Sequence, residues 1–437
     1  MTVDHIEIRV AVEVVSSPTL SYTYLGTRRP TVYSVTVTNI GPDATAGTVV
    51  EPRIRIESPL DIPVADEWVG NSRPLPPPSK LHPEPISWER IRLSASPRVL
   101  GQLNEQVNAE IVTEFVTEDN EVVASDRQPL LLLAANAWTD DRDHHGALGA
   151  FVVPNSPALV PILRKAREIL LEATGDSSTG AYQGRPEEGM LRVRQIARAV
   201  YESIRTIGID YAVAEGSFKT GQKIRSPRAI LEQNAGTCLD TSVLYASCLS
   251  AAGVEPVIFV VAGHAFSGYY TWKMRPPDEF LEDGVVTDPN LIGEMWKANM
   301  VQPVETTTLC RRSPPVGFEE ACEQNHNYLR NEDNSMESML DIGQVKRLGY
   351  HAPPEPGVAP VEEVDDDVAW PVPDPAGDLE TVEFDFFEAV AVDVDDDEDR
   401  RTPPRVRQWQ NSLLDLSARN QLLKMKAKSP RFMEFDV

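Results

Sequence analysis

The sequence contains no apolar run long enough to cross a membrane. None of its apolar segments approaches the roughly 18 to 20 residues that a helical span needs. Its first ten residues, MTVDHIEIRV, also lack the basic region followed by an apolar region that marks an export signal. We therefore predict a cytoplasmic protein that does not associate with membranes.

Cysteine is scarce, and its spacing excludes common structural uses. The four cysteines among 437 residues form no CxxC pair, so neither a zinc site of that type nor a disulfide framework is expected. His144 and His145 are adjacent, but no third ligand accompanies them at a helical or strand spacing, which favours an exposed pair over a metal site. A calcium loop of the DxDxDG type is also missing. We predict no metal and no cofactor.

Basic residues are outnumbered, but the imbalance is concentrated in one place. The formal net charge is −26, from 41 Lys and Arg against 67 Asp and Glu. Between Pro353 and Asp399 there are 18 acidic residues and no basic one, so the rest of the chain carries only −8. A mildly acidic body offers no basic surface for phosphate backbones, and we predict no direct binding of nucleic acid.

Short alternating segments fill residues 1–137. The segments HIEIRVAVEVV, PTVYSVTVTNIGPD, PRIRIESP and AEIVTEFVTE alternate apolar and polar residues and are separated by Pro, Gly and Asn. Short strands at these intervals are typical of an immunoglobulin-like β-sandwich. We expect this domain to act as a spacer or docking domain, with carbohydrate or protein binding as the alternative.

Residues 138–352 predict a second domain, of α+β class. Segments 156–175 and 190–208 carry apolar residues three and four positions apart and end at glycines, as amphipathic helices do. The elements expected after them are a helix over 239–252, strands over 256–262, 265–272 and 301–309, and helical segments at 317–329 and 340–350.

The last two segments differ from the domains before them. Residues 353–403 combine proline and acidic residues without a helical or strand period, which indicates a disordered linker. Residues 404–437 predict an amphipathic helix with Val406, Trp409 and Leu413 on one face. Such an apolar stripe must pack on something, either the body of the protein or a continuation beyond Val437.

A candidate nucleophile stands at the start of the helix over 239–252. Cys238 follows a Gly-Thr turn, and the free N–H groups and positive dipole end of a helix N-terminus favour a thiolate. His264 follows 26 residues later, after a helix, a turn and a strand that bring the chain back beside the cysteine. A histidine there can pair with the thiolate and protonate a leaving group. Cys248, Cys310 and Cys322 lie in apolar surroundings and predict packed side chains.

These residues also resemble a known superfamily. The segment GTCLDTSVLYASCLSAAGVEPVIFVVAGHAF, with PVETTTL, resembles the core of the transglutaminase-like superfamily, which has a papain-like fold. The resemblance covers roughly residues 150–350 and implies Cys238 as nucleophile, His264 as general base and acid, and Asp240 as a structural capping acid. Phe266 matches the aromatic residue that the family places soon after the histidine. The family's third acid is most often Asp, whereas the best-placed acid here is Glu305.

Two acids compete for the third position. Asp288, in VVTDPN, imitates a sequence that often follows the superfamily's acid, but Gly284 and Pro289 bracket it and indicate a loop. Glu305 lies on a β-branched segment that is long enough to pair antiparallel with the strand after His264. A histidine-orienting acid needs a rigid neighbouring strand, so we predict that Glu305 binds the imidazole nitrogen remote from Cys238.

Two further features near the expected site have open interpretations. The backbone N–H of Cys238 is one expected oxyanion donor, and Gln222 in TGQKIR is a candidate side-chain donor, although a glutamine that caps a turn is equally consistent. The segment from Lys273 to Val301 predicts either a lid over the cleft or a structural insertion.

The C-terminal segment carries a second resemblance. RQWQNSLLDLSARNQLLKMK is similar to the segment that precedes the helicase core in very large bacterial helicase-related proteins. Some of these carry a transglutaminase-like domain upstream, and some act in defence against phage. The resemblance implies an N-terminal piece whose partner is a downstream helicase or nuclease region. The chain has no GxxxxGK[ST] loop, so it is not expected to be the motor.

Two hypotheses about function follow. The first is a thiol hydrolase or acyltransferase that attacks an amide of a protein or peptide substrate through a thioester on Cys238, with proteolysis or deamidation favoured over crosslinking. The second is a catalytically silent interaction module that senses a partner and controls an attached helicase.

Overall fold

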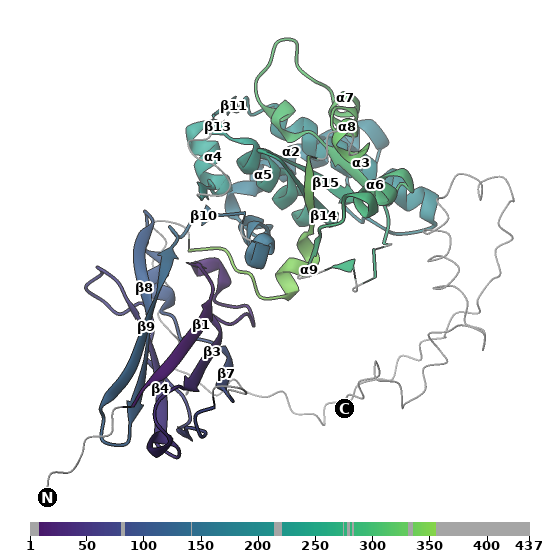
Figure 1. Cartoon of the computed structure of the whole chain (residues 1–437). Helices are drawn as coiled ribbons and strands as arrows, with labels where there is room; N and C mark the ends of the chain where they lie inside the picture. Colours follow the sequence, from purple (N-terminus) through teal and green to yellow (C-terminus); the bar gives the residue numbers. More distant parts are fainter. Residues whose placement is uncertain are drawn as a thin grey trace, which may run out of the picture. The chain divides into compact units, whose positions relative to one another are not determined.

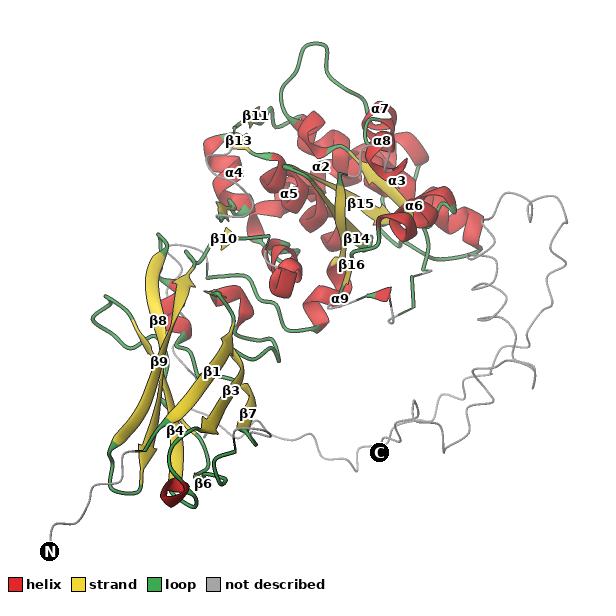
Figure 2. Ribbon diagram, viewed as in Figure 1, coloured by secondary structure: helices red, strands yellow, loops and turns green. Residues whose placement is uncertain are grey.

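The structure of the chain is a computed structural model that describes residues 8–79, 84–140, 142–213, 221–273, 275–277, 280–281, 284–330 and 335–354. The chain divides into two units, residues 1–353 and 354–437. The linker and C-terminal helix predicted from the sequence lie outside the described residues. The described part is an α+β structure with several separate sheets, as Figures 1 and 2 show.

The strands of the first 140 residues are β1 (Val10–Ser16), β2 (Thr19–Leu20), β3 (Val32–Asn39), β4 (Val49–Glu57), β5 (Trp68–Val69), β6 (Arg73–Pro74), β7 (Ile86–Ile91), β8 (Val107–Thr117), β9 (Val122–Leu132) and β10 (Ala137–Trp138). The later strands are β11 (Asp210–Tyr211), β12 (Gln222–Lys223), β13 (Ala235–Gly236), β14 (Pro256–Val261), β15 (His264–Tyr270), β16 (Val285–Val286), β17 (Val301–Val304) and β18 (Met336–Asp341).

The α-helices are α1 (Pro97–Gly101), α2 (Val160–Thr174), α3 (Pro186–Arg205), α4 (Pro227–Gln233), α5 (Cys238–Ala251), α6 (Pro289–Lys297), α7 (Phe318–Glu323), α8 (His326–Arg330) and α9 (Ile342–Arg347). The short 3-10 helices are η1 (Tyr22–Tyr24), η2 (Asp43–Thr45), η3 (Arg142–Phe151), η4 (Pro157–Leu159) and η6 (Thr306–Leu309). Among the described helices, none combines the length and apolar character that a bilayer span requires.

Two sheets in the N-terminal part share one core. One sheet has the order β1-β3-β7, and the other runs β2-β9-β8-β4-β5. Their side chains alternate along the strands as the sequence predicted, and β4 buries every second residue. Apolar residues of both sheets, among them Val35 of β3 and Phe115 of β8, meet in a single buried cluster. The immunoglobulin-like assignment itself stays a prediction.

A five-stranded sheet organises the C-terminal part, in the order β16-β18-β14-β15-β17. All six residues of its central strand β14 are buried, which explains the unbroken apolar sequence PVIFVV. β15 pairs antiparallel with β14 on one side and with β17 on the other. After α5 the chain runs along β14 and then returns along β15. His264 is the first residue of β15.

Helix α5 is buried along nearly its whole length beside β14 and β15 (Figure 1). One of its faces, with Tyr245 and Cys248, packs into a core shared with α2 and α3. The opposite face, with Leu239 and Val243, packs into a second core with β14 and α9. A helix that is apolar all round must be surrounded in this way, and the packing fixes the position of its N-terminus.

Several helix ends carry the residues that capping favours, and the sequence predicted the end of α2 correctly. Gly175 ends α2 with a left-handed backbone at φ +75°, a conformation that only glycine adopts without strain. α4 follows the N-cap Ser226 and has Pro227 as its first residue. α6 follows the N-cap Asp288 and also has a proline, Pro289, as its first residue.

Other predictions in this part were wrong. The expected strand over 301–309 ends at Val304, because Glu305 caps a 3-10 turn in its place. The helical segment over 317–329 is two short helices, α7 and α8. The segment over 340–350 begins as the end of a strand, β18, which lies between β14 and β16 and was missed. Pairing on both edges stabilises this strand whatever its local propensity.

Candidate functional site

Cys238 is the first residue of α5, and its position is fixed by a capping box. The Thr237 side chain accepts a hydrogen bond from the backbone N–H of Asp240, and the Asp240 carboxylate accepts one from the N–H of Thr237. This reciprocal pair stabilises the first turn of a helix. Cys238 is therefore held at the positive end of the α5 dipole.

Asp240 has a second role in holding this turn. Its side chain is fully buried, and it accepts hydrogen bonds from the Arg225 backbone N–H at 2.7 Å and the Arg225 guanidinium at 2.8 Å. The carboxylate thus ties the segment before α4 to the start of α5. This agrees with the capping role that the resemblance implied for Asp240.

His264 lies between the other two predicted residues. Its Nε2 is 2.9 Å from Oε2 of Glu305, and the nearby Cys238 side chain is one of the groups that raise the pKa of its ring. Because Nε2 faces the carboxylate, Nδ1 is the nitrogen left for the sulfur. The structure therefore brings Cys238, His264 and Glu305 together from α5, β15 and the end of β17.

Glu305 is held from both of its carboxylate oxygens. Oε2 faces His264, and Oε1 accepts hydrogen bonds from the Thr307 backbone N–H at 2.9 Å and from the Thr307 hydroxyl at 2.6 Å. Arg312 in turn donates to the Thr307 hydroxyl oxygen at 3.3 Å. The side chain is only 7% exposed, so this arrangement leaves the carboxylate little freedom to turn away from the histidine.

The electrostatics of the pair favour the charged forms. Burial lowers the pKa of His264, but hydrogen bonds to Cys238 and Glu305 outweigh it and raise the pKa to about 10. Burial raises the pKa of Glu305, yet the His264 and Thr307 hydrogen bonds outweigh it and lower that pKa below its ordinary value. These shifts favour an imidazolium at His264 beside the ionised Glu305 carboxylate.

The other three thiols lie in different surroundings. All four cysteines are free. Burial raises the pKa of Cys310 to about 11 and of Cys322 to about 12, and it raises that of Cys248 further. Desolvation disfavours a thiolate at each of them, so they are packing residues, as the sequence indicated.

Asp288 does not take part in this arrangement. It is exposed and forms the N-cap of α6, where its carboxylate accepts a hydrogen bond from the Asn290 N–H at 2.9 Å. Its carboxylate therefore binds the first turn of α6 and not His264, in agreement with the loop signals around it.

Gln222 lies beside the start of α5. Its side chain is buried, and its amide nitrogen donates to the Thr237 hydroxyl oxygen at 3.3 Å. The strand pair β10–β12 holds it there, with Trp138 opposite Gln222. Because an amide nitrogen carries two N–H groups, this bond to the N-cap does not use both donors. Both interpretations of Gln222 made from the sequence therefore remain open.

Aromatic rings flank the histidine. Phe266 and Tyr328 have ring centroids 6.1 and 6.3 Å from that of His264. Tyr211, half exposed, pairs with Gly236, two residues before Cys238. Of these three, the sequence identified only Phe266, because Tyr211 and Tyr328 approach the site from distant parts of the chain.

The segment between Lys273 and Val301 is partly described, and its described elements belong to the sheet layer. β16 pairs with β18, and α6 buries Leu291, Ile292 and Met295. Because these elements pair in the sheet and bury apolar side chains, they fit the structural insertion and give no support to a lid.

His144 and His145 do not form the exposed pair that was predicted. His144 is 3% exposed and its ring stacks on Tyr24, with centroids 3.7 Å apart. Nε2 of His145 lies 3.4 Å from the Asp140 carboxylate. The apolar surroundings supplied by residues distant in sequence explain the burial. Among the described residues, no group of three His, Cys, Asp or Glu side chains could hold a metal ion.

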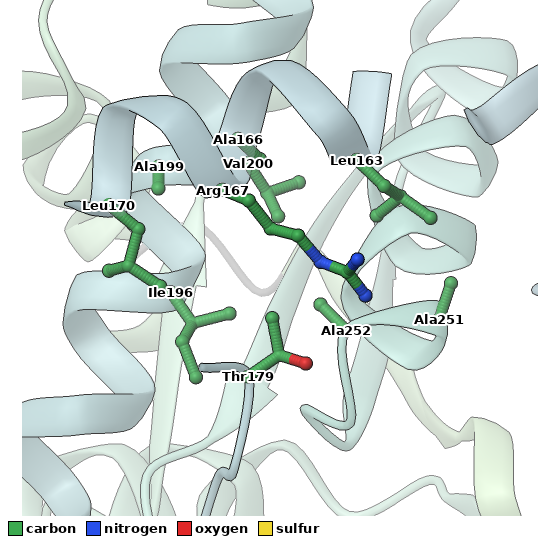
Figure 3. A pocket seen from close by; sticks show the side chains of 10 residues that line it. All are labelled: Leu163, Ala166, Arg167, Leu170, Thr179, Ile196, Ala199, Val200, Ala251 and Ala252. Atoms are coloured by element: carbon green, nitrogen blue, oxygen red, sulfur yellow. The ribbon is translucent and has the colours of Figure 1, made fainter. Parts of the chain in front are cut away.

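A separate pocket lies between α2 and α3, away from the three residues (Figure 3). Side chains of both helices line it together with Thr179, Ala251 and Ala252, and Arg167 extends across it. Its lining is largely aliphatic and contains no nucleophile or pair of titratable groups. It offers no chemistry comparable to that around Cys238.

Comparisons with known proteins give no family for the chain. No protein-family model matches it, and no curated protein matches it. A solved target of the Northeast Structural Genomics Consortium is 14% identical over 29% of this chain and 87% of that chain, with a TM-score of 0.15. A family 76 glycoside hydrolase from a bovine Bacteroides thetaiotaomicron strain is 9% identical over 66% of this chain and 58% of that chain, with a TM-score of 0.14. Similarities this weak support no inference about fold or activity.

Proposed function

We propose that the chain is a thiol hydrolase or acyltransferase of the transglutaminase-like kind, which acts on an amide of a protein or peptide. The observation that carries the proposal is the 2.9 Å contact of His264 with the Glu305 carboxylate, next to Cys238 at the N-terminus of a buried helix. A thiolate, an imidazolium and an orienting acid are the three groups that acyl transfer to sulfur requires.

The proposed reaction has two halves. The Cys238 thiolate attacks the amide carbonyl carbon, the C–N bond breaks, and His264 gives its proton to the departing amine. The neutral imidazole then takes a proton from water, or from an acceptor amine, which attacks the thioester and releases Cys238. Glu305 fixes the ring orientation and stabilises its charge throughout. The backbone N–H of Cys238 and the Gln222 amide are the candidate donors to the oxyanion.

A search over many peptides at once tests this proposal and identifies the substrate. Wild-type protein and a Cys238→Ala variant are incubated with a proteome-derived peptide library, which is then read by mass spectrometry. New termini that depend on Cys238 indicate hydrolysis, conversion of Gln to Glu indicates deamidation, and added amines indicate acyl transfer. Identical libraries after both incubations, with Cys238 also unreactive toward an alkylating agent, would refute the enzyme proposal.

One observation favours a second candidate, a catalytically silent interaction module. Cys238 is only 5% exposed, so an incoming carbonyl has little access to the sulfur in this arrangement. In this case the same fold would sense a partner and control an attached helicase. The proposed setting in a bacterial helicase-related protein, with a role in defence, rests on the similarity of residues 404–437 alone, and these lie outside the described residues.

A further inference from the structure

One buried hydroxyl touches the three elements that carry the candidate site. Ser242 is fully buried one turn after Cys238 on α5. Its Oγ lies 2.7 Å from the Cys238 carbonyl oxygen, 2.8 Å from the Thr306 hydroxyl and 3.3 Å from the Ala265 carbonyl oxygen. Ala265 follows His264, and Thr306 follows Glu305, so each contact is at or next to a residue of the site.

The direction of these hydrogen bonds follows from the number of protons. A serine hydroxyl carries one proton, and its shortest carbonyl contact is to Cys238. The 2.8 Å contact is then satisfied when the Thr306 hydroxyl donates to Ser242. Both side chains are fully buried, so water does not compete for either bond.

We propose that Ser242 and Thr306 are positioning residues that hold the Cys238, His264 and Glu305 elements in the register that lets the thiolate and imidazolium pair. This inference rests on the proposed function. Neither hydroxyl touches the reacting atoms. Each acts by fixing the backbone to which a site residue is attached, where a displacement of about 1 Å can lower a reaction rate a hundredfold.

The same helix offers a matched control. Ser247 is also fully buried, and its Oγ donates to the Val243 carbonyl oxygen at 2.7 Å, in the geometry that Ser242 has with Cys238. It accepts a hydrogen bond from the Val153 N–H at 3.0 Å, which lies on a segment that carries no site residue. A Ser247→Ala change therefore removes a comparable buried hydroxyl without touching the candidate site.

The experiment compares alkylation of Cys238 by iodoacetamide at pH 6 and pH 9 in the full chain, quantified by peptide mass spectrometry. The variants are Ser242→Ala, Thr306→Val, Thr306→Ser and Ser247→Ala. We expect the Ser242→Ala and Thr306→Val rates to fall about tenfold or more at pH 6. At pH 9, where a thiol ionises without help from histidine, we expect them to stay near the wild-type rate. Thr306→Ser, which retains the hydroxyl, and Ser247→Ala should behave as wild type.

The outcomes separate this inference from the proposed function. If wild-type Cys238 is fast at pH 6 but Ser242→Ala and Thr306→Val match Ser247→Ala, the positioning role is wrong and the proposed function stands. Equal losses at both pH values would also overturn the role, since they indicate a general structural change. Should Ser242→Ala fail to fold, the Thr306→Val and Thr306→Ser pair gives the same comparison. A wild-type Cys238 no faster than Cys248 contradicts the proposed function itself.

Discussion

Cys238 and Cys248 lie on the same buried helix, ten residues apart, and differ in almost everything else. Cys238 is the first residue of α5, behind a capping box, and its side chain is one of the groups that raise the pKa of His264. Cys248 lies in the last turn of the helix, inside an apolar core, where burial raises its pKa far above the ordinary value. Exposure does not separate the two, since both are buried. The two thiols differ instead in the groups that surround each sulfur.

The comparison shows that the N–H groups of the first turn and the apolar packing of the last turn of one helix are different chemical environments. Free N–H groups, a dipole end and an imidazolium stabilise negative charge at the N-terminus of α5. At Cys248, ten residues later, the backbone N–H groups donate within the helix. Buried apolar residues surround its thiol. Substitutions of these two cysteines and of the residues around Cys238 give the following predictions, from the largest expected effect to the smallest.

Removing each thiol separately should have opposite consequences. Cys238→Ala should abolish turnover of any substrate found in the peptide library, because no other described group can replace the nucleophile. Cys248→Ala should keep turnover and lower the thermal midpoint by a few degrees, since a buried contact worth about 1 kcal/mol is lost. Turnover that survives Cys238→Ala would show that the reaction does not use this thiol.

Replacing Glu305 by Gln should weaken the charge on the histidine. The wild-type pKa of about 10 means that His264 is an imidazolium at every lower pH and loses its proton only as pH rises through that value. Without the carboxylate this midpoint should fall by about one to three pH units. Turnover at neutral pH should drop about a thousandfold.

NMR of isotope-labelled histidine measures the His264 midpoint directly, with His264→Ala to assign the signal. Asp288→Asn is the control, because Asp288 is the competing acid and should leave the midpoint unchanged. An unchanged midpoint in Glu305→Gln would show that Glu305 does not stabilise the imidazolium.

Gln222 can be tested by separating turnover from thiol reactivity. If its amide donates to the oxyanion, Gln222→Ala should lower turnover about a hundredfold and leave the alkylation rate of Cys238 near wild type. If the amide only supports the N-cap Thr237, both rates should change together, because the helix start itself is disturbed. An unchanged turnover on a validated substrate removes Gln222 from the site.

Asp288→Ala should have the smallest effect. The N-cap of α6 is lost, which costs about 1 kcal/mol of stability, while turnover stays near wild type. Thermal unfolding and a rate measurement on the same sample check both parts. A large loss of turnover with little change in stability would restore Asp288 as the competing acid.

Local patterns in the sequence predicted the elements around the candidate site well. Periodicity and turn residues predicted a helix start at Cys238, two strands around His264 and a strand through Glu305. The structure begins β15 at His264 itself and ends β17 one residue before Glu305. The contact between His264 and Glu305 was expected and is present at 2.9 Å. The domain assignments and the roles of these residues remain predictions.

What the sequence did not predict depends on contacts between distant residues. Strand β18 owes its conformation to pairing with β14 and β16, and its sequence MESMLD carries no strand period. His144 is buried because Tyr24, 120 positions earlier, stacks on it. The bond between Ser242 and Thr306 joins residues 64 positions apart. A serine four residues after a candidate nucleophile was a usable signal, but its partner could not be named from one sequence.

The central claim is that Cys238, beside His264 at the start of α5, is the reactive thiol among the four. Competitive alkylation of the wild-type protein by iodoacetamide at pH 6 tests it directly, with the four cysteines quantified separately by mass spectrometry and His264→Ala as control. We predict that Cys238 reacts at least about a hundredfold faster than Cys248, and that His264→Ala removes most of this difference. Equal, slow reaction of all four thiols would contradict the account.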